Sequence, residues 1–366
     1  MAKVKIVQIE NFYPAFIEQY YTRFPALSSW SYASQLQVLL DSGWSSGQNV
    51  VPYLNPAKYD AHYIIPSFSS LQKIWAAENG LNQSEITADQ ILLNQLEKIK
   101  PDIIYLSDVF CFNFEILKFL SKKPLVMCWH ATALAPDISW GLIDVLLSGV
   151  GSIRKQASAL GARATEEFMS GAPNFQQKNK LQIIGIGDTC FSGSFIGGLH
   201  TERAKLFYDT AMAVAPHNFD IYTSNPFPRA DAVNMRFGNA VYASDVINLY
   251  ANYKVVVDAR ADFGLKDNSF TGETSNMRIF EATKAGCLLL TQASNNLSKY
   301  FEIDKEIVTY ESKEELCDKL KFYLDPKNES LRKLIAENGH IKTIGSHSIE
   351  SRALWFSKIL DKYLNK

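Results

Sequence analysis

Two glutamates, Glu273 and Glu281, stand eight positions apart around a segment that carries a hydroxyl, an amide and a guanidinium. Ser275 is predicted to cap a helix over 275–285, which would leave the backbone N–H groups of 276–278 unpaired and partly positive. A helix start of this kind suits a diphosphate, and Arg278 would add fixed positive charge there. Asn276 lies in the same stretch and is grouped with these binding residues.

The two carboxylates suit the rest of a nucleotide-sugar. Glu281, inside the predicted helix, could accept hydrogen bonds from a ribose diol, and Glu273, just before it, could accept them from a hexose. An alternative stays open, in which the segment is an ordinary amphipathic helix with solvated charges. Its buried positions would then be Met277, Phe280, Ala282 and Ala285.

This spacing resembles the C-terminal donor motif of the retaining family-four GT-B glycosyltransferases, the glycosyl transferases of group 1. The wider segment 274–291 is similar to the CgeB-like branch of bacterial GT-B enzymes. Fainter similarity extends to 11–14, 100–108, 191–195 and 346–348. The resemblance implies an α/β protein of GT-B type, with two Rossmann-like doubly wound domains facing across a cleft.

Hydrophobic periodicity along the chain alternates strand and helix, as expected of parallel sheets. Strands are predicted near 3–9, 61–66, 102–107, 125–130 and 144–148, and again near 191–195, 219–223, 254–259, 287–291 and 306–310. Helices are predicted near 15–24, 31–42, 69–79, 86–99, 113–121 and 152–160, then 200–214, 243–252, 275–285 and 312–324. The alternation predicts two such units, over 1–172 and 181–345, and the resemblance implies that the first is the acceptor-side domain and the second the nucleotide-sugar domain. The tail 346–366 should be helical, and in the family it crosses back to the first domain.

Ligands of open α/β sheets bind at the carboxyl ends of the strands. His130 ends the apolar run 125–129, where its imidazole could bind a sugar hydroxyl or act as a base. Asp108 ends the preceding strand and is the alternative base. Together with Glu273 these residues form the predicted catalytic set, although His130 also fits a satisfied strand-end histidine and Asp108 a turn or N-cap residue.

Cations for a diphosphate are predicted in two further places. The stretch 191–203 reads as a strand, a glycine-bearing loop and a helix start, in which Gly193, Gly197 and Gly198 would allow close backbone approach. Arg203 would reach the diphosphate, as a basic residue does in family four, although a plain connector also fits. Arg260, after the run 254–259, is a second candidate, with a surface salt bridge as its alternative role.

Composition limits the partners. A net charge of −1 over 366 residues makes a nucleic-acid surface an unexpected feature. The five scattered cysteines predict reduced thiols and a cytoplasmic protein, and no apolar stretch reaches the roughly 20 residues of a spanning helix. The chain has no Asp-x-Asp triplet and no paired histidines, which fits a reaction without metal or cofactor. Peripheral membrane contact and the oligomeric state stay open.

The sequence therefore predicts a metal-independent glycosyltransferase that moves a sugar from a nucleoside diphosphate to a saccharide or lipid-linked acceptor, in surface polysaccharide or glycoconjugate synthesis. Two alternatives remain. A nucleotide-sugar 2-epimerase has the same fold and binds the same donors. A non-catalytic nucleotide- or glycan-binding module would bind donor without turnover.

Overall fold

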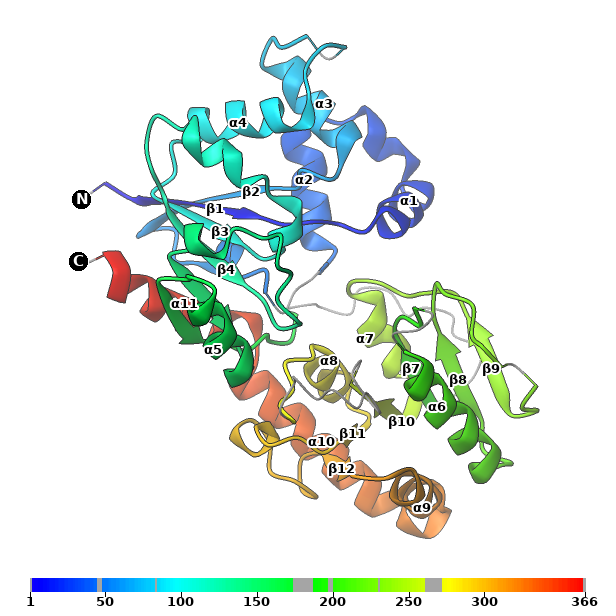
Figure 1. Cartoon of the computed structure of the whole chain (residues 1–366). Helices are drawn as coiled ribbons and strands as arrows, with labels where there is room; N and C mark the ends of the chain where they lie inside the picture. The colour runs from blue at the N-terminus through cyan, green and yellow to red at the C-terminus, as the bar shows by residue number, and fades with distance from the viewer. Residues whose placement is uncertain are drawn as a thin grey trace. The chain divides into compact units, whose positions relative to one another are not determined.

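Each half of the chain alternates apolar strands with helices, and each half forms one parallel six-stranded sheet (Figure 1). The computed structural model describes residues 2–44, 48–82, 84–173, 187–196, 200–229, 231–260 and 272–364. Two units result: unit 1 comprises Met1–Ser170 with Ile349–Lys366, and unit 2 comprises Gly171–Ser348. The sequence placed the first boundary at 172–181, a range of which the structure describes only 172 and 173.

The strands of unit 1 lie in the order β2-β1-β3-β4-β5-β6 and all pair in parallel. They are β1 (Val4–Ile9), β2 (Tyr59–Ile64), β3 (Ile103–Leu106), β4 (Leu125–Trp129), β5 (Val145–Ser148) and β6 (Ala164–Glu167). The helices are α1 (Pro14–Arg23), α2 (Tyr32–Asp41), α3 (Ser69–Glu78), α4 (Ala88–Ile99), α5 (Gly151–Ala159) and α11 (Ile349–Leu364). Short 3₁₀ turns connect them: η1 (Pro25–Ser29), η2 (Val51–Tyr53), η3 (Val109–Cys111), η4 (Phe114–Lys118) and η5 (Trp140–Leu142).

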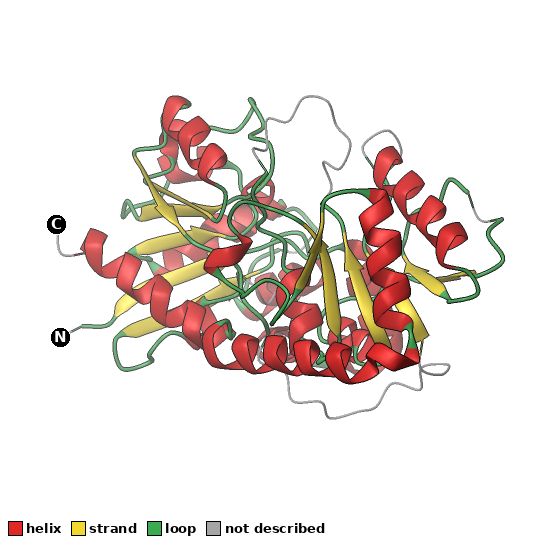
Figure 2. Ribbon diagram, turned by 90° about the horizontal axis from the view of Figure 1, so that it is seen from below, coloured by secondary structure: helices red, strands yellow, loops and turns green. Residues whose placement is uncertain are grey.

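Helix α11 packs on the unit 1 sheet although it comes from the end of the chain. Its buried positions recur every three or four residues, so they form one apolar face. The Phe356 ring centroid lies 4.8 Å from that of Tyr105 in β3 and 5.8 Å from that of Phe168. Figure 1 shows α4 and α11 on opposite sides of this sheet, and Figure 2 shows α11 as a long helix beside its strands.

The strands of unit 2 lie in the order β12-β11-β10-β7-β8-β9, again all parallel. They are β7 (Gly187–Ser192), β8 (Phe219–Tyr222), β9 (Met235–Gly238), β10 (Tyr253–Asp258), β11 (Leu288–Gln292) and β12 (Val308–Tyr310). The helices are α6 (Thr201–Val214), α7 (Asp245–Tyr250), α8 (Arg278–Lys284), α9 (Lys313–Leu324) and α10 (Glu329–Ser346), with 3₁₀ turns η6 (Leu297–Lys299) and η7 (Pro326–Asn328). The core contains tilted ring pairs from α6 and two strands: the Phe207 centroid lies 4.6 Å from that of Phe191 and 5.5 Å from that of Phe219.

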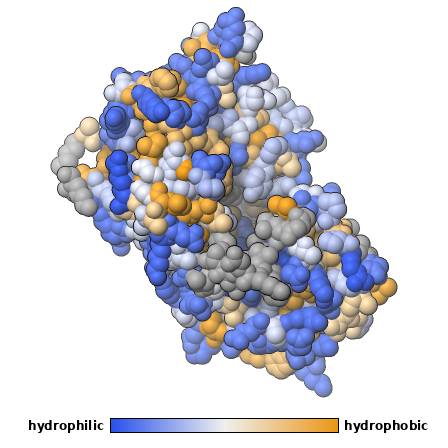
Figure 3. All heavy atoms as spheres, in the orientation of Figure 1, coloured by the Kyte–Doolittle hydropathy of each residue, from blue (hydrophilic) through white to orange (hydrophobic). Residues whose placement is uncertain are grey.

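Several predicted elements differ from the structure. The sequence analysis missed one edge strand of each sheet, β6 in unit 1 and β9 in unit 2, and also missed the helix α10. The helix expected over 113–121 is the short turn η4, and β7 begins at Gly187, four residues before the predicted start. The face drawn in Figure 3 mixes hydrophilic and hydrophobic residues, which is ordinary for the surface of a folded protein.

Candidate functional site

The strand order of unit 2 reverses between β7 and β10, because β8 and β9 continue on one side of β7 and β11 and β12 on the other side of β10. Ligands of open parallel sheets bind outside the carboxyl ends of strands at such a reversal. Four predicted donor-binding residues, Gly193, Asn276, Arg278 and Glu281, gather around this point, and Arg203 approaches it from α6.

Asp258, the last residue of β10, is the centre of the site and was not among the predicted residues. Its side chain is fully buried. One carboxylate oxygen accepts hydrogen bonds from Asn276 Nδ2 at 2.7 Å and from Arg278, and the other accepts one from Thr291 Oγ1 at 2.9 Å. The Tyr310 hydroxyl donates to the Asp258 carbonyl at 2.8 Å. The carboxylate of Asp258 therefore connects β10 to β11 and to the start of α8, and its backbone carbonyl connects β10 to β12.

The Arg278 guanidinium points into the protein and forms a buried ion pair with Asp258. Its Nε donates to the Ser192 carbonyl at 3.0 Å, and the guanidinium lies 4.4 Å from the centroid of the Phe191 ring. Burial by itself lowers the pKa of Arg278, but the combined effect of Asp258, Tyr250 and Glu281 outweighs burial, and the pKa is raised. Arg278 is thus permanently charged and is anchored to protein atoms at the end of β7.

Gly193 allows this approach of the guanidinium to β7. A Cβ at this position would lie 2.7 Å from Arg278 Nη2 and 2.8 Å from the Phe191 ring. No larger residue fits without displacing the arginine or the ring. The predicted role for Gly193 was close approach of the backbone to a ligand; what the structure itself shows is close approach to Arg278. Gly197 and Gly198 lie outside the described residues.

Arg203, in the first turn of α6, is 5% exposed. Its guanidinium donates to the carbonyl of Ser194 and, at 3.4 Å, to that of Ala259, and it lies 5.3 Å from the ring centroid of Phe195. Its Nε has no hydrogen-bond partner within the described residues. Burial and the nearby charge of Arg278 lower the pKa of Arg203 to about 10.

These groups leave a surplus of positive charge. Around Asp258, the two positive charges of Arg203 and Arg278 face the one negative charge of Asp258, and Glu281, whose pKa is raised to about 7, offsets the remaining positive charge only in part near neutral pH. A buried charge without a counter-ion is costly, so an anion bound here would be strongly favoured.

The helix start differs from the prediction. Helix α8 begins at Arg278 with Met277 as its N-cap, so Ser275 is not the cap. The N–H of Asn276 donates to Thr274 Oγ1 at 3.3 Å, and the N–H of Arg278 donates to Asn276 Oδ1 at 3.0 Å. Two of the three backbone donors expected to be open are therefore occupied by short polar side chains, which compete effectively for N–H groups at helix starts.

The segment that carries Glu273 and Ser275 is tied to the loop after β11. Thr274 N donates to Asn296 Oδ1 at 2.9 Å, and Asn296 Nδ2 donates back to the Thr274 carbonyl at 2.7 Å. Gly272, at φ +65°, supplies the turn before it. Glu273 and Ser275 are both partly buried in this segment.

Glu281 lies in the first turn of α8, one turn earlier than predicted, and its side chain is partly exposed. Burial raises the pKa of Glu281 to about 7, against the opposing effect of the Arg278 charge. Near neutral pH this carboxyl group therefore exchanges between a hydrogen-bond acceptor and a form that also donates.

Arg260 follows β10 and is held by the loop after β11. Its backbone N–H donates to Gln292 Oε1 at 3.2 Å, and Nη1 donates to the Ala293 carbonyl at 3.1 Å. The structure therefore places Arg260 beside the carboxyl end of β11.

His130 and Asp108, the other two predicted catalytic residues, belong to unit 1 and follow β4 and β3. His130 is 6% exposed and packs edge-on between the rings of Phe110 and Trp140. Its Nε2 lies 3.2 Å from both the Ala133 carbonyl and Thr132 Oγ1, so a neutral ring protonated at Nε2 donates to the carbonyl and has its lone pair at Nδ1. Burial lowers the pKa of His130, although the Asp108 charge opposes this. Asp108 caps η3 by accepting from Phe110 N at 3.0 Å.

Unit 1 has its own strand reversal, between β1 and β3, with a buried carboxylate that the sequence did not suggest. Glu10, which is 3% exposed, accepts hydrogen bonds from the Tyr63 hydroxyl at 2.7 Å and Ser107 Oγ at 2.8 Å. Gln8 Nε2 lies 3.3 Å from the same oxygen. The pair Gln8 and Glu10, at alternate positions of an apolar strand end, was the available signal.

The described part of the chain contains no metal-ligating cluster, no membrane-spanning helix and no disulfide. Its residues include no cluster of three or more His, Cys, Asp or Glu side chains able to hold a metal ion. None of its helices combines the length and hydropathy needed to cross a membrane. All five cysteines are free thiols, four of them buried.

Comparison with known proteins shows what the chain is similar to. Residues 203–356 match the family described as "Glycosyl transferase-like", a match that covers less than half of the chain and includes Arg203, Asp258 and α8. No curated protein matches the sequence significantly.

Solved structures match over far more of the chain. A glycosyltransferase from Rickettsia africae aligns over 100% of this chain and 99% of its own, at 11% identity and a TM-score of 0.61. HepE from Anabaena, in complex with UDP and glucose, aligns over 98% and 100% at 11% identity, with a TM-score of 0.60. Sucrose-phosphate synthase from Thermosynechococcus elongatus aligns over 83% and 81% at 10% identity, with a TM-score of 0.53. The predicted fold class is confirmed: the two parallel six-stranded α/β units have the fold of GT-B glycosyltransferases.

Proposed function

We propose that this protein is a glycosyltransferase of the cytoplasm that moves a sugar from a nucleoside diphosphate sugar to a saccharide or lipid-linked acceptor, in the synthesis of a surface polysaccharide or another glycoconjugate. The observation that carries the proposal is the surplus positive charge of Arg203 and Arg278 over Asp258 at the carboxyl ends of β7 and β10. The family match over 203–356 and the GT-B fold support the same reaction class.

In this proposal, unit 2 binds the donor. Arg203 is the principal partner of the diphosphate, because its Nε has no hydrogen-bond partner within the described chain. Arg278 acts through its charge, since Asp258 and Ser192 already hold its guanidinium. Glu281 accepts hydrogen bonds from the ribose, and Glu273 from the transferred sugar.

Cleavage of the donor leaves negative charge on the departing diphosphate. Fixed positive groups aimed at that charge lower the barrier without reorganising during the reaction. We propose that the two arginines suffice, so transfer continues in excess EDTA. In unit 1, His130 Nδ1 is proposed to receive the proton of the acceptor hydroxyl, with Asp108 as the alternative base. The CgeB-like assignment and retention of configuration stay predictions.

A thermal-shift panel of UDP, GDP, ADP and TDP, with the matching monophosphates, tests donor recognition. HepE was solved with UDP, which makes UDP the first probe. Ligand at 100 times its dissociation constant stabilises by about 2.7 kcal/mol. We expect one diphosphate to stabilise the protein more than its monophosphate does. No stabilisation by any diphosphate would contradict the proposal.

A turnover assay then separates the three functions left open by the sequence. A transferase consumes the sugar nucleotide, with release of the diphosphate, and does so faster when an acceptor is present. A 2-epimerase converts the donor without an acceptor, and a binding module leaves it intact. Repeating the assay in excess EDTA tests independence from metal; loss of transfer that added Mg²⁺ or Mn²⁺ restores would overturn that part.

A further inference from the structure

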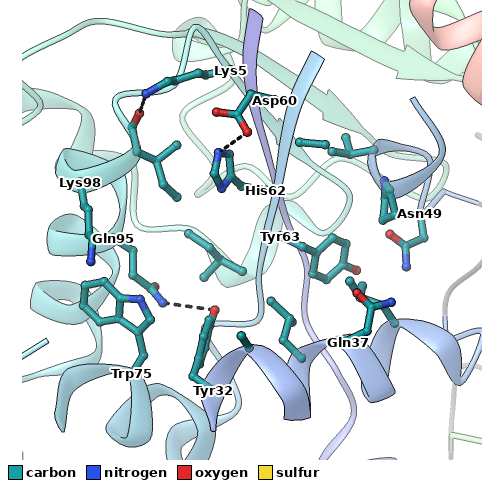
Figure 4. Close-up of a pocket in the computed structure, with 18 of the residues that line it drawn as sticks. Lys5, Tyr32, Gln37, Asn49, Asp60, His62, Tyr63, Trp75, Gln95 and Lys98 are labelled. Atoms are coloured by element: carbon teal, nitrogen blue, oxygen red, sulfur yellow. Dashed lines mark hydrogen bonds and ion pairs between the residues drawn. The ribbon is translucent and has the colours of Figure 1, made fainter. Parts of the chain in front are cut away.

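A cavity lies within unit 1, along the edge strand β2 (Figure 4). Its volume is about 780 Å³, within the range of small-molecule sites. Helix α2 contributes Tyr32, α3 contributes Trp75, and α4 contributes Gln95 and Lys98. We call it the edge pocket. Asp108 and His130 follow the interior strands β3 and β4, which β1 separates from β2, and neither residue lines the edge pocket.

Two residues that line the edge pocket have buried amide oxygens with no partner among the described residues. Gln95 is 2% exposed, and its Nε2 donates to the Tyr32 hydroxyl at 3.4 Å. Its Oε1 has no hydrogen bond to any described residue, and the same holds for Asn49 Oδ1, in a side chain that is 4% exposed. Buried acceptors of this kind cost stability unless a donor from water or a ligand reaches them. The edge pocket is therefore prepared for a molecule that offers hydroxyl or N–H donors.

Charge in the edge pocket is balanced. Lys5 donates to the Ile99 carbonyl at 3.0 Å and Lys98 to Asn79 Oδ1 at 2.5 Å. His62 Nε2 lies 3.2 Å from Asp60, as Figure 4 shows. With Asp41 also in the lining, two lysines face two aspartates. Such a lining gives no net attraction to a phosphate or a carboxylate, in contrast to the arginines of unit 2.

Aromatic rings complete the lining. Trp75 is partly buried and Tyr32 stands near Gln95, so flat apolar surface and amide groups occur together (Figure 4). A sugar ring matches this mixture, because its C–H groups contact an aromatic face while its hydroxyls donate to amide oxygens. We propose that the edge pocket binds a neutral saccharide through hydrogen bonds to Gln95 and Asn49 and contact with Trp75. This site does not depend on the proposed transfer reaction.

The test uses the full-length ¹⁵N-labelled protein and the indole N–H signal of Trp75, assigned by its loss in Trp75→Phe. The probes are trehalose, maltose, lactose and diacetylchitobiose, with trehalose 6-phosphate as the charged comparator. We expect at least one neutral disaccharide to shift the signal saturably, with or without UDP. Trehalose 6-phosphate should bind no more tightly than trehalose. No shift with any neutral probe would mean that water satisfies the amides, and tighter binding of the phosphate would refute a neutral ligand.

Two variants locate the binding. Gln95→Leu removes the amide at similar volume and should weaken the affinity at least tenfold. Trp75→Ala, measured by calorimetry, should weaken the affinity similarly. This second variant still tests the proposal if Gln95→Leu does not fold. Trp30→Ala is the matched control, since Trp30 is a 46% exposed ring of unit 1 outside the edge pocket. Unchanged affinity in Trp75→Ala, or equal losses in Trp75→Ala and Trp30→Ala, would overturn the proposal.

Discussion

Units 1 and 2 have the same kind of parallel sheet, but they place opposite chemistry where the strand order reverses. In unit 1 the reversal between β1 and β3 buries Glu10, whose carboxylate accepts hydrogen bonds from the neutral side chains of Tyr63 and Ser107. In unit 2 the reversal between β7 and β10 brings two arginines to one aspartate. The shared topology thus supplies only the location, and the residues at the strand ends decide which ligand is favoured.

The largest effect should come from removing the partner of Asp258. Arg278→Met leaves a fully buried carboxylate without its cation, so we expect the free energy of unfolding of unit 2 to fall by about 3–5 kcal/mol. This free energy of unfolding can be measured by urea denaturation, monitored through spectroscopic signals from residues of unit 2. The double variant Arg278→Met with Asp258→Asn should recover much of the loss. If the double variant is no more stable than Arg278→Met alone, the ion pair does not organise the site.

The next largest effect concerns unit 1 and turnover. His130→Ala should lower turnover about 100-fold, the lower range for a general base, with little change in UDP affinity. Since burial lowers the pKa of His130, the wild-type ring is already neutral at pH 7 and its activity should not rise from pH 7 to 8. Asp108→Asn provides the comparison. If a folded His130→Ala protein keeps full turnover, His130 is not the general base and Asp108 becomes the candidate.

Arg203→Met should separate binding from stability. Loss of its hydrogen bonds to a diphosphate should weaken UDP binding by about 2 kcal/mol, the usual value for charged groups. Stability should fall less than in Arg278→Met, because the variant removes a surplus charge instead of breaking an ion pair. Arg236→Met, which removes a bidentate partner of Asp220 elsewhere in unit 2, is the matched control. Equal UDP affinity in both variants would exclude Arg203 from the site.

The smallest effect is the pH dependence that Glu281 gives to binding. Because burial raises its pKa to about 7, the carboxylate that accepts ribose hydroxyls is lost as pH falls through 7. We expect UDP affinity to increase about fivefold from pH 6 to 8, roughly 1 kcal/mol. The ionised form is the one that folding disfavours, so the free energy of unfolding should decline as pH rises from about 4.5, the usual pKa of glutamate, through 7. Glu281→Gln should flatten both profiles; profiles identical to wild type would assign the titration to other groups.

The sequence predicted the parts of the fold that are locally encoded. Buried central strands such as β10 and β11 are continuous apolar runs, which are easy to recognise. The missed β6 reads Ala-Thr-Glu-Glu and is half-buried at a sheet edge, and the missed α10 contains Gly339 and Gly345. Such elements depend on tertiary packing more than on their own pattern.

The candidate site was predicted only in part, because a sequence shows local spacing but not the pairing of residues that are far apart in the chain. Glu281 and Arg278 stood out because their spacing is local. Asp258 pairs with Arg278 twenty positions away, and only the parallel alignment of β10 and β11 brings them together. Ser275 was predicted as the N-cap from its residue type, but the side chains of Thr274 and Asn276 accept the hydrogen bonds from the backbone N–H groups.

Hydrogen exchange of the full-length protein with and without saturating UDP tests the contrast between the two units most directly. The account predicts that UDP slows exchange in unit 2, in the end of β7 at 190–196 and in the segment 272–284, and leaves β1 and β3 of unit 1 unchanged. Protection confined to 4–10 and 103–108 in unit 1, or no protection in unit 2 at saturating UDP, would contradict it.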